Sequence, residues 1–377
     1  MQVLFRTDAS VAIGSGHLMR CLTLAQALRQ AGHQVYFACR QHPGHLLPLL
    51  TDLGFTTFTL PLLANPPQQG YQAWLGCSEA EDASALVACL DQTPATTVQS
   101  PKMFDWLVVD HYGLGAIFCQ ALRSRCRAVL QIDDLANRQY DCDVLLDQNL
   151  VPDFASRYQT LLPDHCQPLL GPRFALLRPE FAGFDPIQRQ FHTAFNSHSP
   201  ARVLVFFGGS DEQNFTTLAI NALQQLQESH WLADIVIGQA NPHRLLLQQL
   251  CAQDRRLTLL VQTPGMAGLM AAADLMIGAG GATHWERACL GLPAIVVALA
   301  DNQQATTQYL ASLGACIDLG SADQLSAGQL AQATATLLND VTLRARMSAA
   351  AQQLVPEGGG VPHLLQLLQQ STTTRTT

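Results

Sequence analysis

Short apolar runs of strand length alternate with helical patterns along two stretches of the chain, and this alternation constrains the fold more than any other feature. It is typical of βαβ units, in which helices cover a parallel sheet. In the first stretch an apolar run at 3–5 is followed by a helical pattern from about His17 to Gln30, which Gly32 ends. Further strands are predicted at 35–38, 106–110, 128–132 and 144–146. The second stretch predicts strands at 202–207, 234–237, 257–261, 275–277 and 294–299.

The region between the two stretches has a different character. Residues 151–200 hold seven prolines and little regular periodicity, which predicts an interdomain linker. We therefore expect an α/β protein of two doubly wound Rossmann-like domains, at 1–150 and 201–360, with a C-terminal helix and polar tail over 361–377. The carboxyl ends of both sheets are expected to face a central cleft, where ligands of open α/β sheets bind.

Charge and hydropathy exclude several classes of partner. The net charge is −8 and no cluster of Lys and Arg occurs, so neither nucleic acid nor an anionic lipid surface is an expected partner. No apolar run reaches the roughly 18 residues of a membrane helix, and Arg6 and Asp8 interrupt the apolar start, unlike a signal peptide. We expect a cytoplasmic protein without membrane insertion.

The cysteines do not predict a disulfide framework or a metal site. Eleven is an odd number, and no Cys-x-x-Cys spacing occurs, so reduced and mostly buried thiols are expected. Asp133 and Asp134 follow a predicted strand and are possible metal ligands, but no third ligand lies at a suitable spacing. Turn and cleft-lining roles are favoured for them, and no metal is expected.

The first candidate site lies between the first strand and the first helix. Arg6 and Asp8 end the strand, and Gly14, Gly16 and His17 lead into the helix. Glycines there let the backbone approach a ligand, and the partial positive charge of a helix start favours a neutral histidine that can act as a general base. The glycine spacing alone is a weak signal, and the alternative is a histidine that only caps the helix.

The second candidate is a glycine turn after the first strand of the second stretch. Gly208 and Gly209 precede Ser210 and Asp211 and then a helical pattern. Exposed backbone N–H groups and a helix start suit a diphosphate. The alternative is a plain turn with Ser210 or Asp211 as the helix N-cap.

The third candidate is a glycine-rich strand end that opens a helix, followed by a second polar strand end. A carboxylate at Glu286 in the first turns can accept hydrogen bonds from the hydroxyls of a ribose, although it is also favourably placed as a simple helix-start carboxylate. His284 is expected to pack or cap. The amides that follow the next strand can bind sugar hydroxyls or acetamido groups. The candidate ligand residues here are Gly280, Gly281, Thr283, Glu286, Asn302 and Gln303.

A fourth polar cluster ends the strand predicted at 106–110. Asp110, His111 and Tyr112 fall at its carboxyl end and therefore at the cleft. Tyr112 is placed to close over a sugar ring.

These segments together resemble a known family along essentially the whole chain. The matching runs are FRTDASVAIGSGHLMRCLTLA, WLGCSEAEDA, VVDHYGL, IDDLANRQYDCDVLLDQN, LLGPRFALLRPEF, FFGGSDEQNFT and GAGGATHWERACLGLPAIVVALADNQ. With them the chain resembles the PseG family, the UDP-sugar hydrolases of pseudaminic acid biosynthesis. The resemblance implies a GT-B architecture, shared with the lipid II-forming N-acetylglucosaminyltransferase MurG. It also implies a product, a precursor of nonulosonates, that serves flagellin glycosylation or a surface polysaccharide.

The same resemblance implies roles for individual residues. His17 matches the catalytic histidine, Tyr112 a cleft tyrosine, and Glu286 with Asn302 the nucleotide and sugar contacts. Gly115 departs from the family, in which an acidic residue is expected after the DHYGL stretch. The chain ends soon after its last predicted helix, so a fused acetyltransferase domain is not expected.

The predicted reaction is hydrolysis of UDP-2,4-diacetamido-2,4,6-trideoxy-β-L-altropyranose, or a close relative, to UDP and free sugar. Water attacks the anomeric carbon with inversion, His17 acts as base, and neither cofactor nor metal takes part. The expected partners are the UDP-sugar and, transiently, other enzymes of the pathway. Two alternatives stay open: a GT-B glycosyltransferase that passes the sugar to an acceptor, and a non-catalytic protein that binds a nucleotide sugar.

Overall fold

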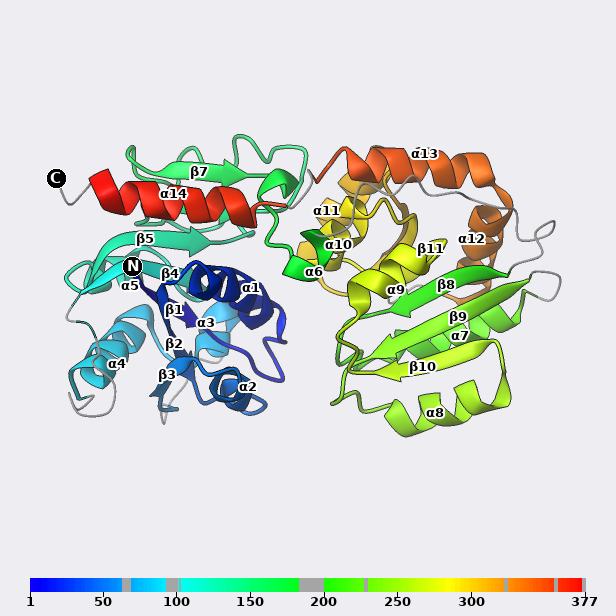
Figure 1. Ribbon diagram of the computed structural model, residues 1–377, viewed down its shortest axis with the longest axis horizontal. Helices are drawn as coiled ribbons and strands as arrows, with labels where there is room; N and C mark the ends of the chain where they lie inside the picture. The colour runs from blue at the N-terminus through cyan, green and yellow to red at the C-terminus, as the bar shows by residue number, and fades with distance from the viewer. Residues whose placement is uncertain are drawn as a thin grey trace. The chain divides into compact units, whose positions relative to one another are not determined.

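The computed structural model describes residues 1–62, 69–92, 101, 103–182, 200–226, 230–321, 325–355 and 359–374. The chain divides into two compact units, each built on one parallel sheet (Figure 1). Unit 1 comprises Met1–Asn149, Asp153–Leu176 and Gly360–Thr377, and unit 2 comprises Leu150–Pro152 and Leu177–Gly359. The two doubly wound domains expected from the alternating pattern are confirmed.

Unit 1 contains a seven-stranded sheet in the order β3-β2-β1-β4-β5-β6-β7, with every pairing parallel. Its strands are β1 Gln2–Thr7, β2 Gln34–Arg40, β3 Thr56–Leu60, β4 Phe104–Asp110, β5 Cys126–Ile132, β6 Val144–Asp147 and β7 Gln167–Leu170. Its helices are α1 Gly16–Gln30, α2 Leu47–Asp52, α3 Gly70–Leu75, α4 Glu79–Gln92, α5 Ala116–Leu122, the 3₁₀ turn η1 Pro172–Phe174 and α14 Val361–Thr374.

The central strands of unit 1 are apolar on both faces because helices cover both sides of the sheet. On β1, Val3 and Phe5 join a buried cluster with residues of α1 and α14, whereas Leu4 joins the opposite cluster with residues of α4 and α5. Successive side chains of a strand point to opposite faces, so one short apolar run contributes to both layers.

Helix α14 brings the end of the chain back to unit 1 (Figure 1). The indole Nε1 of Trp106 donates a hydrogen bond to the carbonyl oxygen of Leu368 at 3.2 Å, and Leu364 packs in the same cluster as α1. Gly360 precedes the helix, where an added Cβ would lie 2.2 Å from the backbone of Phe174, so only glycine allows this approach. The last described helix therefore completes the first unit.

Unit 2 contains a six-stranded parallel sheet in the order β10-β9-β8-β11-β12-β13. Its strands are β8 Ala201–Phe206, β9 Trp231–Ile237, β10 Leu257–Val261, β11 Leu275–Ala279, β12 Ala294–Ala298 and β13 Ile317–Ser321. Its helices are α6 Pro179–Ala182, α7 Phe215–Gln224, α8 Arg244–Gln253, α9 Met266–Ala272, α10 Thr283–Cys289, α11 Asp301–Ser312, α12 Ala327–Asn339 and α13 Val341–Gln352.

The predicted linker over 151–200 is wrong for its first half. Residues 153–176 belong to unit 1, where β7 pairs with β6 and is followed by η1. Prolines do not prevent this, because β7 is an edge strand and Pro168 lies where a missing N–H is tolerated. The second half of the prediction, from 183 to 199, lies outside the described residues, as do residues 375–377 of the predicted polar tail.

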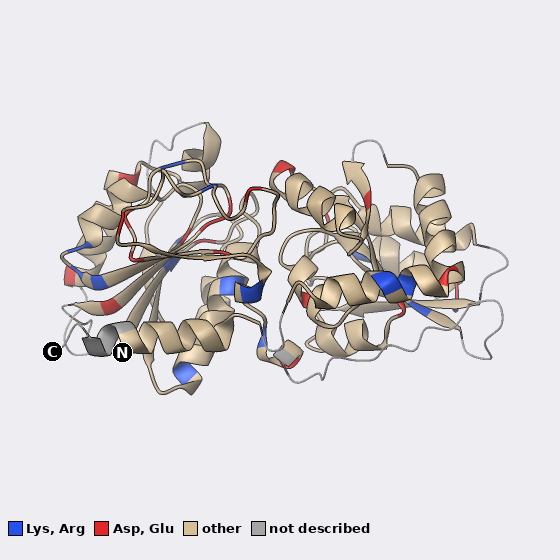
Figure 2. Cartoon of the chain, turned by 90° about the horizontal axis from the view of Figure 1, so that it is seen from above, with Lys and Arg blue, Asp and Glu red and all other residues tan. Residues whose placement is uncertain are grey.

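The surface chemistry of the described residues agrees with the low charge of the sequence. Charged residues occur at scattered positions on a mostly uncharged ribbon (Figure 2). Among the described helices, none has the length and apolar character needed to cross a membrane. All eleven cysteines are free thiols, and eight of them are buried.

Candidate active site

Both sheets change the direction of their strand order at one point, and polar residues gather there. In unit 1 this switch point lies between β1 and β4, and in unit 2 it lies between β8 and β11. Ligands of doubly wound sheets bind outside the carboxyl ends of the strands at such points. Thr7 at the end of β1 is in register with Asp110 at the end of β4, and Phe206 at the end of β8 is in register with Gly278.

His17 lies in the first turn of α1 and contacts the end of β4. Its Nδ1 is 2.6 Å from Oδ1 of Asp110, and both side chains are buried. Burial alone would raise the pKa of Asp110, but the Arg20 guanidinium and His17 hold it below its ordinary range. The ionised carboxylate can only accept, so Nδ1 of His17 donates to it and Nε2 is the nitrogen left to accept a proton.

Arg20 holds the same carboxylate from one helical turn further on. Its Nε and Nη2 approach the two oxygens of Asp110 at 2.5 and 2.6 Å, and its Nη1 lies 3.2 Å from Asp134. Because residues three apart share a helix face, His17 and Arg20 reach Asp110 side by side. Nη2 of Arg20 is also 3.1 Å from Nδ1 of His17. Both nitrogens donate hydrogen bonds to Asp110.

Tyr112 packs its ring against the imidazole. The ring centroids of His17 and Tyr112 are 4.5 Å apart with an interplanar angle of 86°. Burial and the hydrogen-bonded Asp134 raise the pKa of Tyr112, so the phenol stays neutral. The structure therefore brings His17 and Tyr112 together, with Tyr112 as a buried wall beside the histidine.

Arg6 and Asp8 lie in a fully buried ion-pair network. Arg6 binds the carboxylate of Asp82 on α4 through two hydrogen bonds of 2.8 Å and approaches Asp8 at 2.7 Å. Arg40 on β2 also contacts Asp82, and its backbone N–H donates to Asp8 at 2.6 Å. Burial would raise the pKa of Asp8, but Arg6, His42 and His111 hold it well below its usual range. Neither Arg6 nor Asp8 is exposed, so both support the site from inside the unit.

His111 is buried behind Tyr112. Burial lowers its pKa to about 3, with Asp8 opposing that shift, so the ring is neutral near pH 7. Its Nδ1 accepts a hydrogen bond from the backbone N–H of Gly113 at 2.9 Å, which puts the proton on Nε2. His111 therefore has a structural role that the sequence pattern did not reveal.

The glycines of the first loop are exposed and lie directly before α1. Gly14 has a φ of +76°, and its N–H donates to the carbonyl of Ser10 at 2.9 Å. Gly16 begins the helix, whose N-cap Ser15 makes no side-chain capping bond. The alternative in which His17 caps the helix does not hold, since its imidazole bonds Asp110 instead.

At Gly115, where the sequence departs from the family that it resembles, a carboxylate from another helix binds the backbone. Glu79 on α4 accepts hydrogen bonds from the N–H groups of Gly115 and Phe118 at 2.9 and 3.0 Å, at the start of α5. An added Cβ at Gly115 would lie 3.0 Å from the carbonyl of Gln139. The helix start thus has its negative partner without an acidic residue at 115.

In unit 2 the glycine turn after β8 is closed by its own aspartate. Gly208 has a φ of +89°, and Gly209 accepts from the N–H of Gly238 at 3.0 Å. Asp211 accepts from the N–H groups of Phe215 and Thr216 at 2.9 and 2.8 Å. The alternative of a plain turn with Asp211 as the capping residue is thereby favoured, because Asp211 already accepts hydrogen bonds from the N–H groups at the start of α7.

The start of α10 differs from that of α7. Gly281 has a φ of +82°, Thr283 begins the helix, and the N-cap Ala282 provides no side-chain cap. Glu286 lies in the first turn, 16% exposed, and its Oε1 is 3.0 Å from both Nε and Nη2 of Arg178. Burial raises the pKa of Glu286, although Arg178 opposes the shift. Arg178 also pairs with Glu180 at 2.6 Å.

A buried hydrogen-bond chain connects α10 with α11. Nη2 of Arg287 donates to Nδ1 of His284 at 3.1 Å, His284 Nε2 contacts Thr307 at 3.1 Å, and Thr307 donates to the carbonyl of Gln303 at 2.8 Å. His284 therefore has the packing role expected of it. An added Cβ at Gly280 would lie 2.9 Å from His284 Nε2.

The two amides of the third candidate lie at the start of α11. Gln303 accepts from the N–H of Leu299 at 3.1 Å, so its side-chain oxygen is bound to the backbone. Asn302 is exposed in the first turn. Asn302 is the more exposed of the two and is in that respect better placed to meet a ligand.

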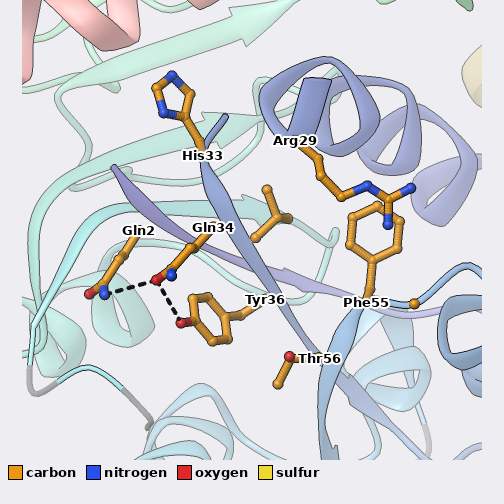
Figure 3. A pocket seen from close by; sticks show the side chains of 9 residues that line it. Gln2, Arg29, His33, Gln34, Tyr36, Phe55 and Thr56 are labelled. Atoms are coloured by element: carbon orange, nitrogen blue, oxygen red, sulfur yellow. Dashed lines mark hydrogen bonds between the residues drawn. The ribbon is translucent and has the colours of Figure 1, made fainter. Parts of the chain in front are cut away.

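A separate hollow of about 450 Å³ lies at the amino ends of the strands of unit 1. Gln2, Gln34 and Thr56, the first residues of β1, β2 and β3, line it, and hydrogen bonds join Gln2 to Gln34 and Gln34 to Tyr36 (Figure 3). The hollow lies at the amino-terminal edge of the sheet. Asp110 lies at the opposite edge, at the carboxyl end of β4. Among the described residues, no three His, Cys, Asp or Glu side chains form a possible metal site, and Asp133 is bound by Arg138, Tyr140 and Tyr158.

Sequence reasoning missed several contacts and residues of these sites. It placed Asp110 at the carboxyl end of its strand but did not predict its contact with His17, although Asp110 ends a central strand beside β1 at the switch point. Arg20 has a weaker one, its spacing of three from His17. Nothing in the sequence pattern predicts the contact of Arg178 with Glu286. Arg178 lies in a segment without periodicity, and 108 positions separate the two residues in the sequence.

Comparison with known proteins agrees with this architecture. Residues 203–358 match the glycosyltransferase family 28 C-terminal domain. Two solved structures that are similar over nearly the whole chain are MurG of Acinetobacter baumannii and the calicheamicin glycosyltransferase CalG4. MurG has a TM-score of 0.65 at 19% identity, covering 98% of this chain and 99% of its own. CalG4 has a TM-score of 0.61 at 14% identity, covering 99% and 98%. The GT-B fold expected from the family resemblance is confirmed.

Two curated proteins are also similar to the chain. The spore coat polysaccharide biosynthesis protein SpsG of Bacillus subtilis is 28% identical over 202 residues, which span 53% of this chain and 57% of that protein. The UDP-2,4-diacetamido-2,4,6-trideoxy-β-L-altropyranose hydrolase of Campylobacter jejuni is 24% identical over 315 residues, which span 83% of this chain and 97% of that protein. The chain therefore has the GT-B fold, its residues 203–358 match the glycosyltransferase family 28 C-terminal domain, and it is similar over most of its length to the Campylobacter jejuni hydrolase.

Proposed function

We propose that this protein hydrolyses a UDP-linked 2,4-diacetamido-trideoxyhexose to UDP and the free sugar. The observation that carries the proposal is the contact between His17 and an ionised, buried Asp110 at the switch point of unit 1. Homology to a hydrolase with this substrate in its name supports the choice of substrate. We further propose that the protein acts in the cytoplasm, where nucleotide sugars are made.

In the proposed mechanism His17 takes a proton from water. Asp110 fixes the proton on Nδ1 and stabilises the imidazolium that forms when Nε2 accepts the second proton. The activated water attacks the anomeric carbon through an oxocarbenium-like transition state, and the bond to the UDP oxygen breaks with inversion. UDP is already a good leaving group, so no carboxylic acid is needed to protonate it.

We assign the nucleotide to unit 2. The uncapped start of α10, with Gly281 and Thr283, offers backbone donors to a diphosphate, and Glu286 accepts from the ribose. Asn302 is assigned to the sugar. The turn at Gly208 and Gly209 has a smaller role than the sequence suggested, because Asp211 already binds the start of α7.

A glycosyltransferase is the second candidate, and the family 28 match favours it. The same histidine would then take the proton from an acceptor hydroxyl instead of water. The deciding experiment incubates the UDP-sugar with the protein in water alone. Release of free sugar at catalytic rates supports hydrolysis, whereas release that depends on an added acceptor supports transfer.

The bond that breaks is a prediction of the mechanism. Reaction in ¹⁸O-water is expected to place the label in the sugar hydroxyl and leave UDP unlabelled, because the base activates water toward carbon and not phosphorus. NMR spectra taken before mutarotation should show the anomeric configuration opposite to that of the substrate. Label in UDP, or products consisting of UMP and sugar phosphate, would show attack at phosphorus and contradict the mechanism.

The role of Glu286 gives a second prediction. Glu286→Gln is expected to weaken UDP binding by about 1–3 kcal/mol, because a charged hydrogen-bond acceptor for the ribose is lost. Calorimetric titration with UDP measures the change. Glu180→Gln is the matched control, since Glu180 shares Arg178 with Glu286 but is not assigned to the nucleotide. Equal UDP affinity in the Glu286 variant and the parent protein would remove Glu286 from the nucleotide site.

A further inference from the structure

Three aromatic rings from two parts of unit 1 form one cluster next to His17. Trp74 stacks on Tyr112 with centroids 5.8 Å apart and an interplanar angle of 27°, and Tyr71 meets Tyr112 at 5.0 Å and Trp74 at 5.1 Å. Tyr112 is 7% exposed, whereas Tyr71 and Trp74 are only half-buried. The cluster therefore connects the imidazole to aromatic surface that solvent can reach.

The fold holds α3 against the site by means of a glycine. An added Cβ at Gly113 would lie 2.7 Å from the carbonyl oxygen of Tyr71 and 3.0 Å from the Cβ of Leu75. Any larger residue after Tyr112 would push α3 away. Leu75 is fully buried in the core of unit 1, which anchors the helix from its other side. The rings of Tyr71 and Trp74 are thus part of a built arrangement.

The polar group of Tyr112 is already engaged, and the ring faces of Tyr71 and Trp74 are apolar. Its hydroxyl is hydrogen-bonded to Asp134, and Asp134 in turn pairs with Arg20. The ring faces of Tyr71 and Trp74 offer no hydrogen bond to a sugar face that is rich in hydroxyls and packs against them. Such hydroxyls would lose their hydrogen bonds to water, whereas methyl groups and ring C–H bonds pack well on aromatic faces.

We propose that Tyr71 and Trp74 form the wall of a sugar subsite that selects a hexose with apolar substituents, a deoxy methyl or an acetamido methyl, over a fully hydroxylated hexose. This inference rests on the proposed function, because it places the sugar beside His17. The histidine must reach the anomeric carbon, and the aromatic wall adjoins the histidine through Tyr112. The same rings then orient the sugar for attack and exclude hydroxyl-rich UDP-hexoses.

The test measures how much the sugar contributes to binding, in a variant that turns the substrate over only slowly. In the His17→Asn background, calorimetry gives the ratio of the Kd for UDP to the Kd for the intact UDP-diacetamido-trideoxyhexose. Trp74→Leu and Tyr71→Leu are each expected to lower this ratio by about tenfold, as loss of a ring contact implies. Affinity for UDP alone should change less than about twofold, because UDP is assigned to unit 2.

Ring-retaining variants provide the matched control. Trp74→Phe and Tyr71→Phe are expected to keep the ratio within about threefold of the parent, since the ring and not a polar group makes the contact. A ratio that falls equally in the Leu and Phe variants, or in none of them, would overturn the inference. Far-UV circular dichroism and a single thermal transition establish that each variant is folded.

A second measurement needs no variant in α3. In saturation-transfer NMR on the His17→Asn protein, irradiating the aromatic protons should saturate the methyl signals of the sugar more strongly than its other protons. Methyl signals that receive no saturation would overturn the inference. An assay of hydrolysis by the parent protein separates this result from the proposed function. If the parent does not hydrolyse the UDP-sugar but the binding ratios change as expected, the hydrolase is refuted and the subsite is retained. If the parent hydrolyses the UDP-sugar but the ratios do not change, the subsite is refuted and the hydrolase is retained.

Discussion

Replacing His17 by asparagine is expected to lower kcat for UDP-sugar hydrolysis by about 10²–10⁴-fold, the usual effect of losing a general base. Asparagine can still donate to Asp110 but cannot accept a proton from water. The affinity for UDP should remain nearly unchanged, because the nucleotide is assigned to the other unit. Steady-state release of UDP, measured with a coupled assay, gives kcat, and calorimetry gives the affinity.

His33→Asn is the control for this experiment. It removes an imidazole from the same unit, at the hollow near the amino ends of the strands (Figure 3). Its kcat should equal that of the parent protein. If His17→Asn also kept a near-normal kcat, the histidine would have no part in the chemistry, whatever its contact with Asp110.

The second large effect concerns stability. Asp82→Asn is expected to lower the free energy of unfolding by about 3–5 kcal/mol, the usual result of removing one partner from a buried ion pair. Arg6 and Arg40 would then be buried cations without the carboxylate that binds both of them. Urea unfolding followed by circular dichroism at pH 7 measures the change.

The pH dependence of this effect has a definite sign. Burial raises the pKa of Asp82, but Arg6 and Arg40 lower it by more than burial raises it. The pKa of Asp82 in the folded state is therefore below its value in the unfolded chain. The stabilisation is therefore present above the unfolded pKa, near 4, and is lost as the pH falls through the folded pKa. The difference between parent and variant should shrink below about pH 4.

An exposed pair between the same residue types serves as the control for Asp82. Asp91 pairs with Arg125 at 2.6 Å, but its side chain is 53% exposed. Asp91→Asn should cost no more than about 1 kcal/mol, because water and salt screen such pairs. Equal losses for Asp82→Asn and Asp91→Asn would mean that the buried network does not stabilise the unit.

The sequence predicted the interior of both sheets and one edge strand, β10, and it missed the other three edge strands. All the strands expected from apolar runs are present, and the three that were missed, β3, β7 and β13, are edge strands. An edge strand has one neighbour and mixed burial, so its sequence carries a weaker apolar signal, as QPLL in β7 and IDLGS in β13 show. The proline-rich segment that contains the edge strand β7 was therefore predicted as a linker.

The candidate sites were predictable to the extent that they depend on local sequence. His17 was identified because glycines, a helix start and a histidine follow one another within a few residues. The partners that determine its chemistry come from elsewhere: Asp110 is 93 residues away, and the ring of Trp74 reaches the site through α3. Arg6 and Asp8 were predicted as ligand residues because charged residues at a strand end suggest a ligand, yet both are fully buried, and Arg6 pairs with Asp8 and with a distant aspartate on α4.

The return of α14 to unit 1 sets an order for folding during synthesis. Unit 2 is nearly continuous in sequence, so it can fold as soon as residue 359 has left the ribosome. Unit 1 emerges first but waits for α14, whose leucines cover the apolar face that includes Trp106 and Leu18. Until α14 is translated, that apolar face stays uncovered. The domain made first is therefore the one completed last.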